Sequence, residues 1–244
     1  MGDIADVYQQ VRTDISQLVT GLSAADLDRT VPATPEWTIR DVVTHLAADA
    51  SCVIVGDFPR EFFAAFGEPD AIRSLNEWTA GQISERAGRS FEEILDEWEG
   101  SAKTLVSIMR GETPLPEEAG MFADRALITD AAVHQQDIHG ALGIDDGRDA
   151  APVRIGLSGY IATMGWRLDD AGIPALVFDA GDKLRTAGSK DPGATARAAR
   201  FEFFRALSGR RNPDQIRAWE WEGDPEPYVH YFYPYGLRED ALVE

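Results

Sequence analysis

The chain has 244 residues, of which 44% are hydrophobic, so it can bury a sizeable core as one large domain or as two modest ones. Its 42 acidic residues outnumber its 23 basic ones and leave a formal net charge of -19, which disfavours nucleic acid and anionic membranes as partners. The single cysteine, Cys52, excludes an intrachain disulfide, and we expect a cytoplasmic protein with no signal peptide and no membrane span.

The first predicted element is an amphipathic helix over Asp3–Leu22, whose apolar residues recur at steps of three and four. A proline-bearing turn, VPATPEW, follows this helix. A second helix is then expected to begin with Thr34 or Thr38 as its cap and to end near Gly56 to Pro59. The apolar face of this second helix consists of Ile39, Val42, Val43, Leu46 and Val53.

Further helices are expected in the first 145 or so residues. One of them, longer than the helix before it, begins with a capping box formed by Ser90 and Glu93, and Gly111 and Pro114 end it. No convincing strand pattern occurs in this part, so residues 1–146 are predicted to form a helical bundle. These helices cover Asp70–Ala87, Ser90–Ile108 and Phe122–Leu142, the last closed by Gly143.

The composition then changes to a loop rich in Asp, Gly and Pro, IDDGRDAAP, which is the predicted domain boundary. Residues 150–244 are predicted to form a second domain of the α+β class. The runs ALVFDAG and KLRTAG suggest a hairpin, and IRAWEW and YVHYFY are strand-like, but the strand order cannot be predicted. The helices expected in this domain cover Val153–Leu168 and Phe201–Leu207.

The last predicted bundle helix carries ionisable residues in the middle of its packing face. Asp130, His134 and Asp137 advance by three and four residues, and burying them is costly unless they are paired or bind a ligand. Asp130 and His134 are four residues apart, the spacing at which a helix offers two ligands to one metal ion. His139 lies five residues after His134 and so belongs to the other face, while Asp137 could orient an imidazole from behind.

A third ligand could come from the second helix. His45 lies on its inward stripe, with Asp49 one turn further on. Cys52 also points inward, but two turns from His45, and is interpreted as a small buried hydrophobic residue. Two other interpretations stay open at this point: His45 as a satisfied core histidine, and Asp130 with His134 as a buried ion pair.

Two stretches resemble a known family. TPEWTIRDVVTHLAAD, from Thr34 to Asp49, and DAAVHQQDIHGALG, from Asp130 to Gly143, are similar to the mycothiol-dependent maleylpyruvate isomerase family of the DinB-like superfamily. The run FEFFRALSGRRNPDQIRAWEWEGD resembles the smaller C-terminal domain of that family. The resemblance implies an α+β protein: an N-terminal DinB-like four-helix bundle, residues 1–146, followed by a small sterol-carrier-like α+β domain, residues 150–244.

The resemblance also implies a site. In that family a divalent metal, usually zinc, is held inside the bundle, and the motifs place its ligands at His45, Asp130 and His134. The isomerase proper has Glu where Asp130 stands and other superfamily members have His, so a ligand is still expected there. The family uses an arginine of the C-terminal domain, for which the GRR motif offers Arg210 as the catalytic candidate; the alternative is that Arg210 and Arg211 merely stabilise a helix C-terminus.

A metal with three protein ligands keeps a fourth position open, which is typical of a catalytic site, and a thiol bound there is ionised. The resemblance implies mycothiol as that thiol. A thiolate that adds to a small electrophile and leaves again gives cis–trans isomerisation, and one that stays gives a conjugate. We therefore expect a metal- and mycothiol-dependent S-transferase or isomerase, monomeric or homodimeric. The alternatives are a non-catalytic protein that binds a metal or a small ligand, and a structural protein whose histidines only pack.

Overall fold

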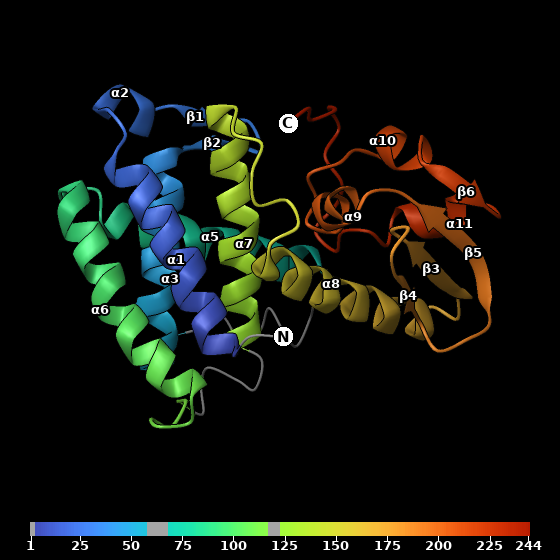
Figure 1. The fold of residues 1–244 in the computed structure, drawn as a ribbon, viewed down its shortest axis with the longest axis horizontal. Helices are drawn as coiled ribbons and strands as arrows, with labels where there is room; N and C mark the ends of the chain where they lie inside the picture. Colours follow the sequence, from blue (N-terminus) through green and yellow to red (C-terminus); the bar gives the residue numbers. More distant parts are fainter. Residues whose placement is uncertain (1–2, 58–67, 117–122) are drawn as a thin grey trace. The chain divides into compact units, whose positions relative to one another are not determined.

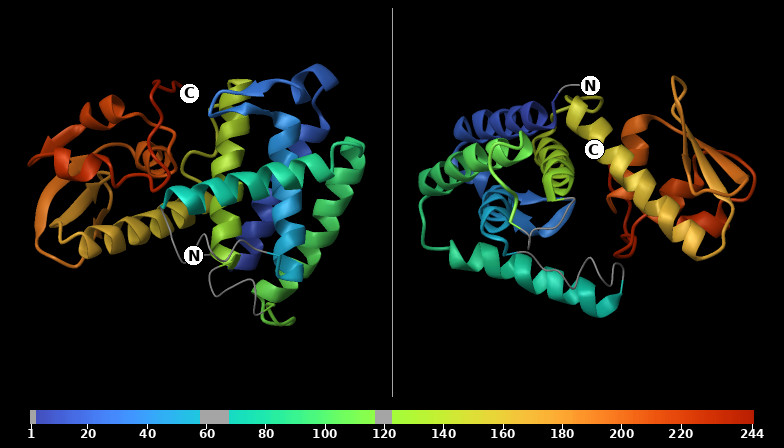
Figure 2. Two further views of the ribbon diagram at one scale, coloured as in Figure 1. Left: turned by 180° about the vertical axis from the view of Figure 1, so that it is seen from behind. Right: turned by 90° about the horizontal axis from the view of Figure 1, so that it is seen from below.

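Long helices build the N-terminal part of the chain in the computed structural model, which describes residues 3–57, 68–116 and 123–244 (Figure 1). Helices α1 and α3 each pack against both α6 and α7, so these four helices close into a bundle. Helix α5 packs on α3 and runs across the bundle rather than along it (Figures 1 and 2). The bounds are α1 Ile4–Thr20, α3 Ile39–Val55, α5 Pro69–Glu85, α6 Phe91–Met109 and α7 Ala123–Leu142.

The predicted ends of these helices agree with the structure because local chemistry sets them. Thr38 accepts from the Asp41 backbone N–H and caps α3, and Ser90 forms the expected capping box with Glu93 at the start of α6. Gly56 follows α3 with φ of 75°, a left-handed conformation that favours glycine. Pro59 and Phe122, also named as helix ends, lie outside the described residues.

The prediction that the first 145 residues contain no strand is wrong. Strands β1, Thr30–Val31, and β2, Thr34–Thr38, form an antiparallel ribbon around the VPATPEW turn, after the short helix α2, Ala24–Leu27. Strands this short show no alternation of polar and apolar residues, so the sequence carries no periodic signal for them. The ribbon runs directly into α3 and places Trp37 beside the start of that helix.

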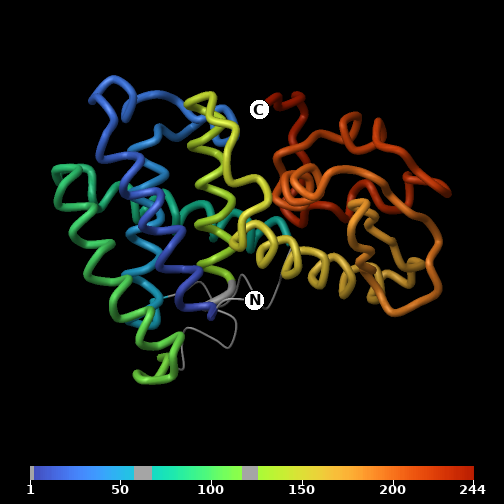
Figure 3. Tube along the Cα trace, viewed as in Figure 1, coloured from blue at the N-terminus to red at the C-terminus, as the bar shows by residue number. Residues whose placement is uncertain are grey.

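A four-stranded sheet forms the core of the C-terminal part, with strand order β4-β3-β5-β6 (Figure 1). Figure 3 traces the path of the chain through this part, from yellow to red. The expected hairpin is present as the antiparallel pair β3 and β4, while β5 lies parallel to β3 and antiparallel to β6. Helix α8 packs on β4. At the end of β4 the two backbones lie so close that an added Cβ at Gly165 would be 2.6 Å from the Gly188 nitrogen, so a residue without a side chain is needed there. The bounds are α8 Ala151–Asp170, β3 Ala175–Asp179, β4 Leu184–Ala187, β5 Pro192–Arg197 and β6 Glu220–Glu222.

Edge-to-face aromatic contacts fill this second core. Phe178 lies 5.0 Å from Phe203 and 5.9 Å from Phe232, and Trp219 contacts both Phe203 and Phe232, at 5.1 and 5.4 Å between ring centroids. The remaining helices of the part are α9 Arg200–Leu207, α10 Pro213–Arg217 and α11 Glu226–Val229.

Two strand predictions in this part need correction. YVHYFY is not a strand. Its first residues belong to the short helix α11 and the rest to the turn after it. The buried residues Tyr228, Val229 and Phe232 accordingly follow helical steps of one and three rather than the alternation of a strand. Of IRAWEW, the beginning belongs to α10 and only its end lies in β6. Strand β5 was not predicted, because its sequence, PGATAR, begins with two residues that are rare in strands.

The predicted fold class is confirmed: a helical N-terminal part precedes a C-terminal part with a small sheet. The chain divides into two units, Met1–Asp146 and Gly147–Glu244, which we describe separately as unit 1 and unit 2. Among the helices that the structure describes, none is long and apolar enough to cross a membrane.

Candidate metal centre

His45, Asp130 and His134 come together inside unit 1. Each offers one ligand atom, and these three atoms all lie within 4.8 Å of one another. The carboxylate of Asp130 lies between the two imidazoles: Oδ2 is 3.2 Å from Nε2 of His45, and Oδ1 is 3.6 Å from Nε2 of His134. The structure therefore brings together the three side chains that the sequence predicts as ligands.

The bundle places these residues for simple reasons. His45 lies on the buried face of α3, which packs against α7, and the four-residue spacing of Asp130 and His134 puts both on one face of α7. The two histidine side chains are each 7% exposed, whereas that of Asp130 is 33% exposed. The cluster is thus buried on its histidine side and meets solvent at Asp130.

The donor atoms lie near the spacing that a small divalent cation requires. Nitrogen and oxygen ligands lie about 2.0–2.2 Å from zinc, so that in a tetrahedral site they lie about 3.3–3.6 Å from one another. Asp130 contacts the two Nε2 atoms through separate oxygens, Oδ2 at 3.2 Å and Oδ1 at 3.6 Å, and one donor atom from each residue gives a set within 4.8 Å, so the three side chains would draw together slightly around a cation. The shorter Asp side chain therefore still reaches both imidazoles.

The other nitrogen of each imidazole faces an acceptor. His134 Nδ1 lies 3.0 Å from Asp137 Oδ2, within ion-pair distance although not aligned as a hydrogen bond. His45 Nδ1 lies 3.3 Å from the amide oxygen of Gln82, whose nitrogen donates to Asp49 at 3.0 Å. Acceptors behind the Nδ1 atoms favour the tautomer with the proton on Nδ1, which leaves Nε2 free to bind a cation.

Trp37 covers the two imidazoles. Its ring centroid lies 5.0 Å from that of His45 and 5.8 Å from that of His134, and the two histidine rings meet edge-on at 5.2 Å. The indole therefore limits the rotation of both rings and keeps water from that side of the cluster.

Negative charge from two carboxylates predominates around His45. Burial alone would lower the pKa of His45, but the charges of Asp49 and Asp130 outweigh burial and raise this pKa to about 9. Burial raises the pKa of Asp49 to about 6, against the opposing effect of the neighbouring His45. A cation placed among these groups would neutralise the same excess of negative charge that holds the proton on His45.

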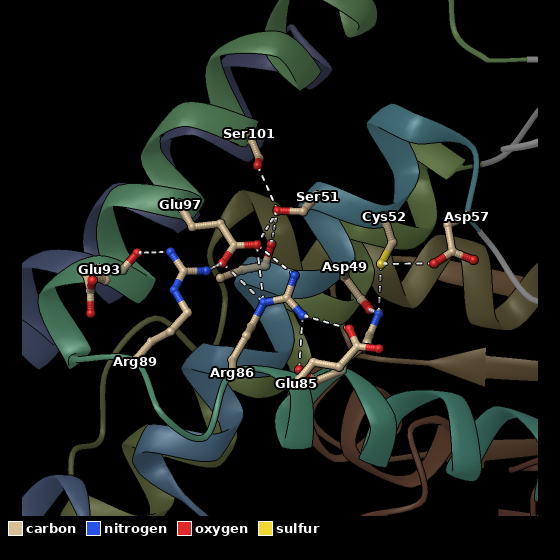
Figure 4. Close-up of polar contacts among 12 residues, drawn as sticks. Asp49, Ser51, Cys52, Asp57, Glu85, Arg86, Arg89, Glu93, Glu97 and Ser101 are labelled. Carbon is tan, nitrogen blue, oxygen red and sulfur yellow. Dashed lines mark hydrogen bonds and ion pairs between the residues drawn. The ribbon is translucent and has the colours of Figure 1, made fainter.

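Two other residues weighed in the sequence lie outside the cluster. His139 is buried, but its Nδ1 lies 3.1 Å from the Asp146 carbonyl oxygen, on the other face of α7 as expected. Cys52 is half-buried rather than buried; its thiol lies 3.8 Å from an oxygen of Asp57 and receives a long contact of 3.5 Å from Gln82 (Figure 4). Burial raises the pKa of this thiol to about 11, so it is a poor nucleophile.

The two arginines of the GRR motif differ in their surroundings within unit 2. Arg211 is buried and pairs with Glu202 at 2.7 Å and with Glu244 at 3.0 Å. Arg210 is half-buried and donates to the Ser208 carbonyl oxygen at 2.6 Å. Arg211 thus serves the internal packing of unit 2.

Gln82, whose amide oxygen lies beside His45 Nδ1, is not identified from the sequence. Nothing in the sequence singles it out, because the burial of Gln82 on α5 is known only from the structure. Trp37 lies within the TPEWTIRDVVTHLAAD motif, but its contact with both histidines depends on the β1–β2 ribbon, for which the sequence carries no periodic signal.

Comparison with known proteins identifies the family of the chain. The sequence matches the family of the mycothiol maleylpyruvate isomerase N-terminal domain over residues 8–139, more than half of the chain, and this range includes all three residues of the cluster. No curated protein sequence matches the chain.

Two solved structures resemble the whole fold. The crystal structure of the mycothiol-dependent maleylpyruvate isomerase is 13% identical with a TM-score of 0.55, and the match covers 85% of this chain and 88% of that one. A histidine-to-alanine mutant of the mycothiol-dependent maleylpyruvate isomerase gives 13% identity and a TM-score of 0.54, covering 84% and 88%. At this identity the likeness shows the shared fold.

Proposed function

The chain belongs to the mycothiol maleylpyruvate isomerase family, and from this premise we propose that it is a metal- and mycothiol-dependent enzyme that transfers a thiol to, or isomerises, a small electrophilic substrate. The observation that carries the proposal is the cluster of His45, Asp130 and His134, whose donor atoms converge inside the bundle while the Asp130 side chain is one-third exposed. We propose zinc as the cation, since two imidazoles and one carboxylate are typical of catalytic zinc sites.

The side chains in and around the cluster would have different roles in metal binding. His45, Asp130 and His134 would hold the cation, which when bound lowers the pKa of a thiol and so supplies a thiolate near neutral pH. Asp137 would orient His134 from behind, and Trp37 would shield both imidazoles from water. Unit 1 is therefore proposed as the metal-binding domain, corresponding to residues 1–146, with residues 150–244 as the second domain.

The covalent chemistry would come from the added thiol rather than from the chain. Cys52 is the chain's only cysteine, and its raised pKa makes it a poor nucleophile. In the proposed reaction, sulfur bonds to a carbon of an activated double bond and the electron pair moves onto the conjugated carbonyl. Rotation and loss of the thiolate restore the double bond as the other isomer, whereas protonation of the carbon gives a conjugate. A reducing cytoplasm would keep such a thiol available.

For a substrate that bears a carboxylate, we propose Arg210 as the charge-assisted partner. The support is the GRR motif, in which Arg210 is half-buried while Arg211 is buried, together with the planar, bidentate match of a guanidinium to a carboxylate.

The proposal predicts that zinc-loaded protein converts electrophiles only when mycothiol is added. The assay is turnover of a panel that includes maleylpyruvate and neutral electrophiles, with and without mycothiol and with a chelator. Activity should require both thiol and metal, because the described residues of the chain supply no activated nucleophile of their own. Cys52→Ala should retain turnover, and Arg210→Ala should impair carboxylate-bearing substrates by about 10-fold or more relative to neutral ones, a difference of about 1.4 kcal/mol.

Equal turnover with and without thiol across the panel would contradict this function. Stoichiometric zinc binding with no turnover of any member would instead support a non-catalytic metal-binding protein of the same fold.

A further inference from the structure

The amide of Gln82 connects two helices at the back of the candidate metal centre. Its nitrogen donates to Asp49 Oδ1 at 3.0 Å, and its oxygen lies 3.3 Å from His45 Nδ1. Gln82 comes from α5, while Asp49 and His45 come from α3. With 3% of its surface exposed, Gln82 is one of the most buried polar residues of unit 1, so its amide depends on these protein partners.

Asp49 fixes the direction in which this amide points. An ionised carboxylate only accepts hydrogen bonds, so Asp49 must face the NH₂ group of Gln82 and the amide oxygen must face His45. An amide oxygen also only accepts, so His45 Nδ1 must carry the proton. When a cation replaces the proton on Nε2, the imidazole keeps its one N–H on Nδ1, and Nε2 offers its lone pair to the cation; this nitrogen lies 3.2 Å from Asp130 and 3.6 Å from Asp49.

Further hydrogen bonds and an ion pair hold the backbone of Gln82 in place. Four residues further along the chain, Arg86 donates to the carbonyl oxygen of Gln82 at 3.0 Å and pairs with Glu97 of α6 at 2.7 Å (Figure 4). Glu97 also accepts from Ser51 of α3 at 2.8 Å. Hydrogen bonds and an ion pair therefore connect the C-terminal end of α5 to both α3 and α6. These contacts position Gln82 along α5 so that its amide lies beside His45.

We propose that Gln82 is a positioning residue that holds His45 in the tautomer and orientation in which Nε2 binds the cation. This inference rests on the proposed function, because it presupposes that a cation binds at His45. Partners behind a metal-binding histidine set its tautomer and typically change metal affinity by about 10–100-fold.

Calorimetric titration of zinc into the full, chelator-treated chain tests the inference. Gln82→Met keeps the length of the side chain but removes the acceptor, and we expect zinc affinity to fall by about 10–100-fold. Gln82→Glu restores an oxygen opposite Nδ1 and should bind zinc more tightly than Gln82→Met. Gln136→Met is the matched control: Gln136 is also 3% exposed and donates to a carbonyl oxygen, that of Asp146 at 3.4 Å, so its zinc affinity should be unchanged.

A second readout separates positioning from a general loss of packing. In zinc-loaded protein, nitrogen-15 NMR should show a slowly exchanging proton on His45 Nδ1, and Gln82→Met should make it exchange rapidly while Gln136→Met should not. Unchanged affinity and unchanged proton exchange in Gln82→Met, with wild-type protein binding zinc, would overturn this inference alone. Wild-type protein that binds no zinc would overturn the proposed function and this inference with it.

Discussion

Replacement of His134 by alanine is expected to abolish stoichiometric zinc binding. His134 Nε2 is one of the three converging donors, 3.6 Å from Asp130, and its loss leaves only two. Because losing a partner behind a ligand already weakens metal binding by about 10–100-fold, loss of a ligand itself should exceed about 100-fold. Zinc content after dialysis, measured by atomic spectroscopy, gives the result directly.

His139→Ala is the matched control for this experiment. His139 is a buried histidine on the same helix, but its Nδ1 faces the Asp146 carbonyl oxygen, so the variant should retain about one zinc per chain. His134→Gln provides a second test if the alanine variant folds poorly, since glutamine fills more of the space left by the imidazole. Full zinc occupancy in both His134 variants, with loss in His139→Ala, would show that the wrong face of α7 has been assigned to the metal.

Replacement of Glu244 by alanine is expected to cost unit 2 about 3–5 kcal/mol of folding free energy. Its carboxylate accepts from Arg205 Nε at 2.9 Å and from Arg211 Nη1 at 3.0 Å. The side chain of Arg205 is 0% exposed, and those of Glu244 and Arg211 are 5% and 4% exposed. Removing the carboxylate takes one buried ionic partner from each of the two arginines, which is the costly way to break a buried ion pair.

Urea denaturation of the full chain, followed by tryptophan fluorescence, measures this loss. The matched control is Glu226→Ala in the same unit, since Glu226 pairs with Arg217 at 2.7 Å but both side chains are about half exposed. Such a surface pair contributes about 0–1 kcal/mol. If Glu244→Ala costs no more than Glu226→Ala, the buried ion pairs of Glu244 do not stabilise unit 2 as described.

Helix ends and helix faces could be predicted from the sequence because they depend on neighbouring residues. The capping threonine and its partner, Thr38 and Asp41, are three residues apart, and so are Ser90 and Glu93. The four-residue step from Asp130 to His134 placed both on one face of α7 for the same reason.

Contacts set by tertiary packing could not be predicted in this way. Strand β5 is held by pairing with β3 on one side and β6 on the other, so its unfavourable Pro and Gly are overridden by its neighbours. The aromatic residues Tyr228 and Phe232 face a core made by distant segments, and aromatic composition alone suggested a strand. Gln82 reaches His45 across 37 positions of sequence, a distance over which no spacing rule applies.

A bound cation is expected to replace the proton on His45 Nε2, which lies beside Asp130. Because the carboxylates raise the pKa of His45 to about 9, that proton must leave when the cation binds below this pH. The apparent zinc affinity should therefore rise by about tenfold per pH unit toward pH 9 and level off above it.

Calorimetric titration of zinc into the chelator-treated chain at about pH 7.5, in two buffers of different ionisation enthalpy, tests this claim most directly. We expect one zinc per chain, with release of about one proton from His45 and loss of both signals in His45→Ala. No zinc binding, or zinc binding that releases no proton and survives in His45→Ala, would contradict it.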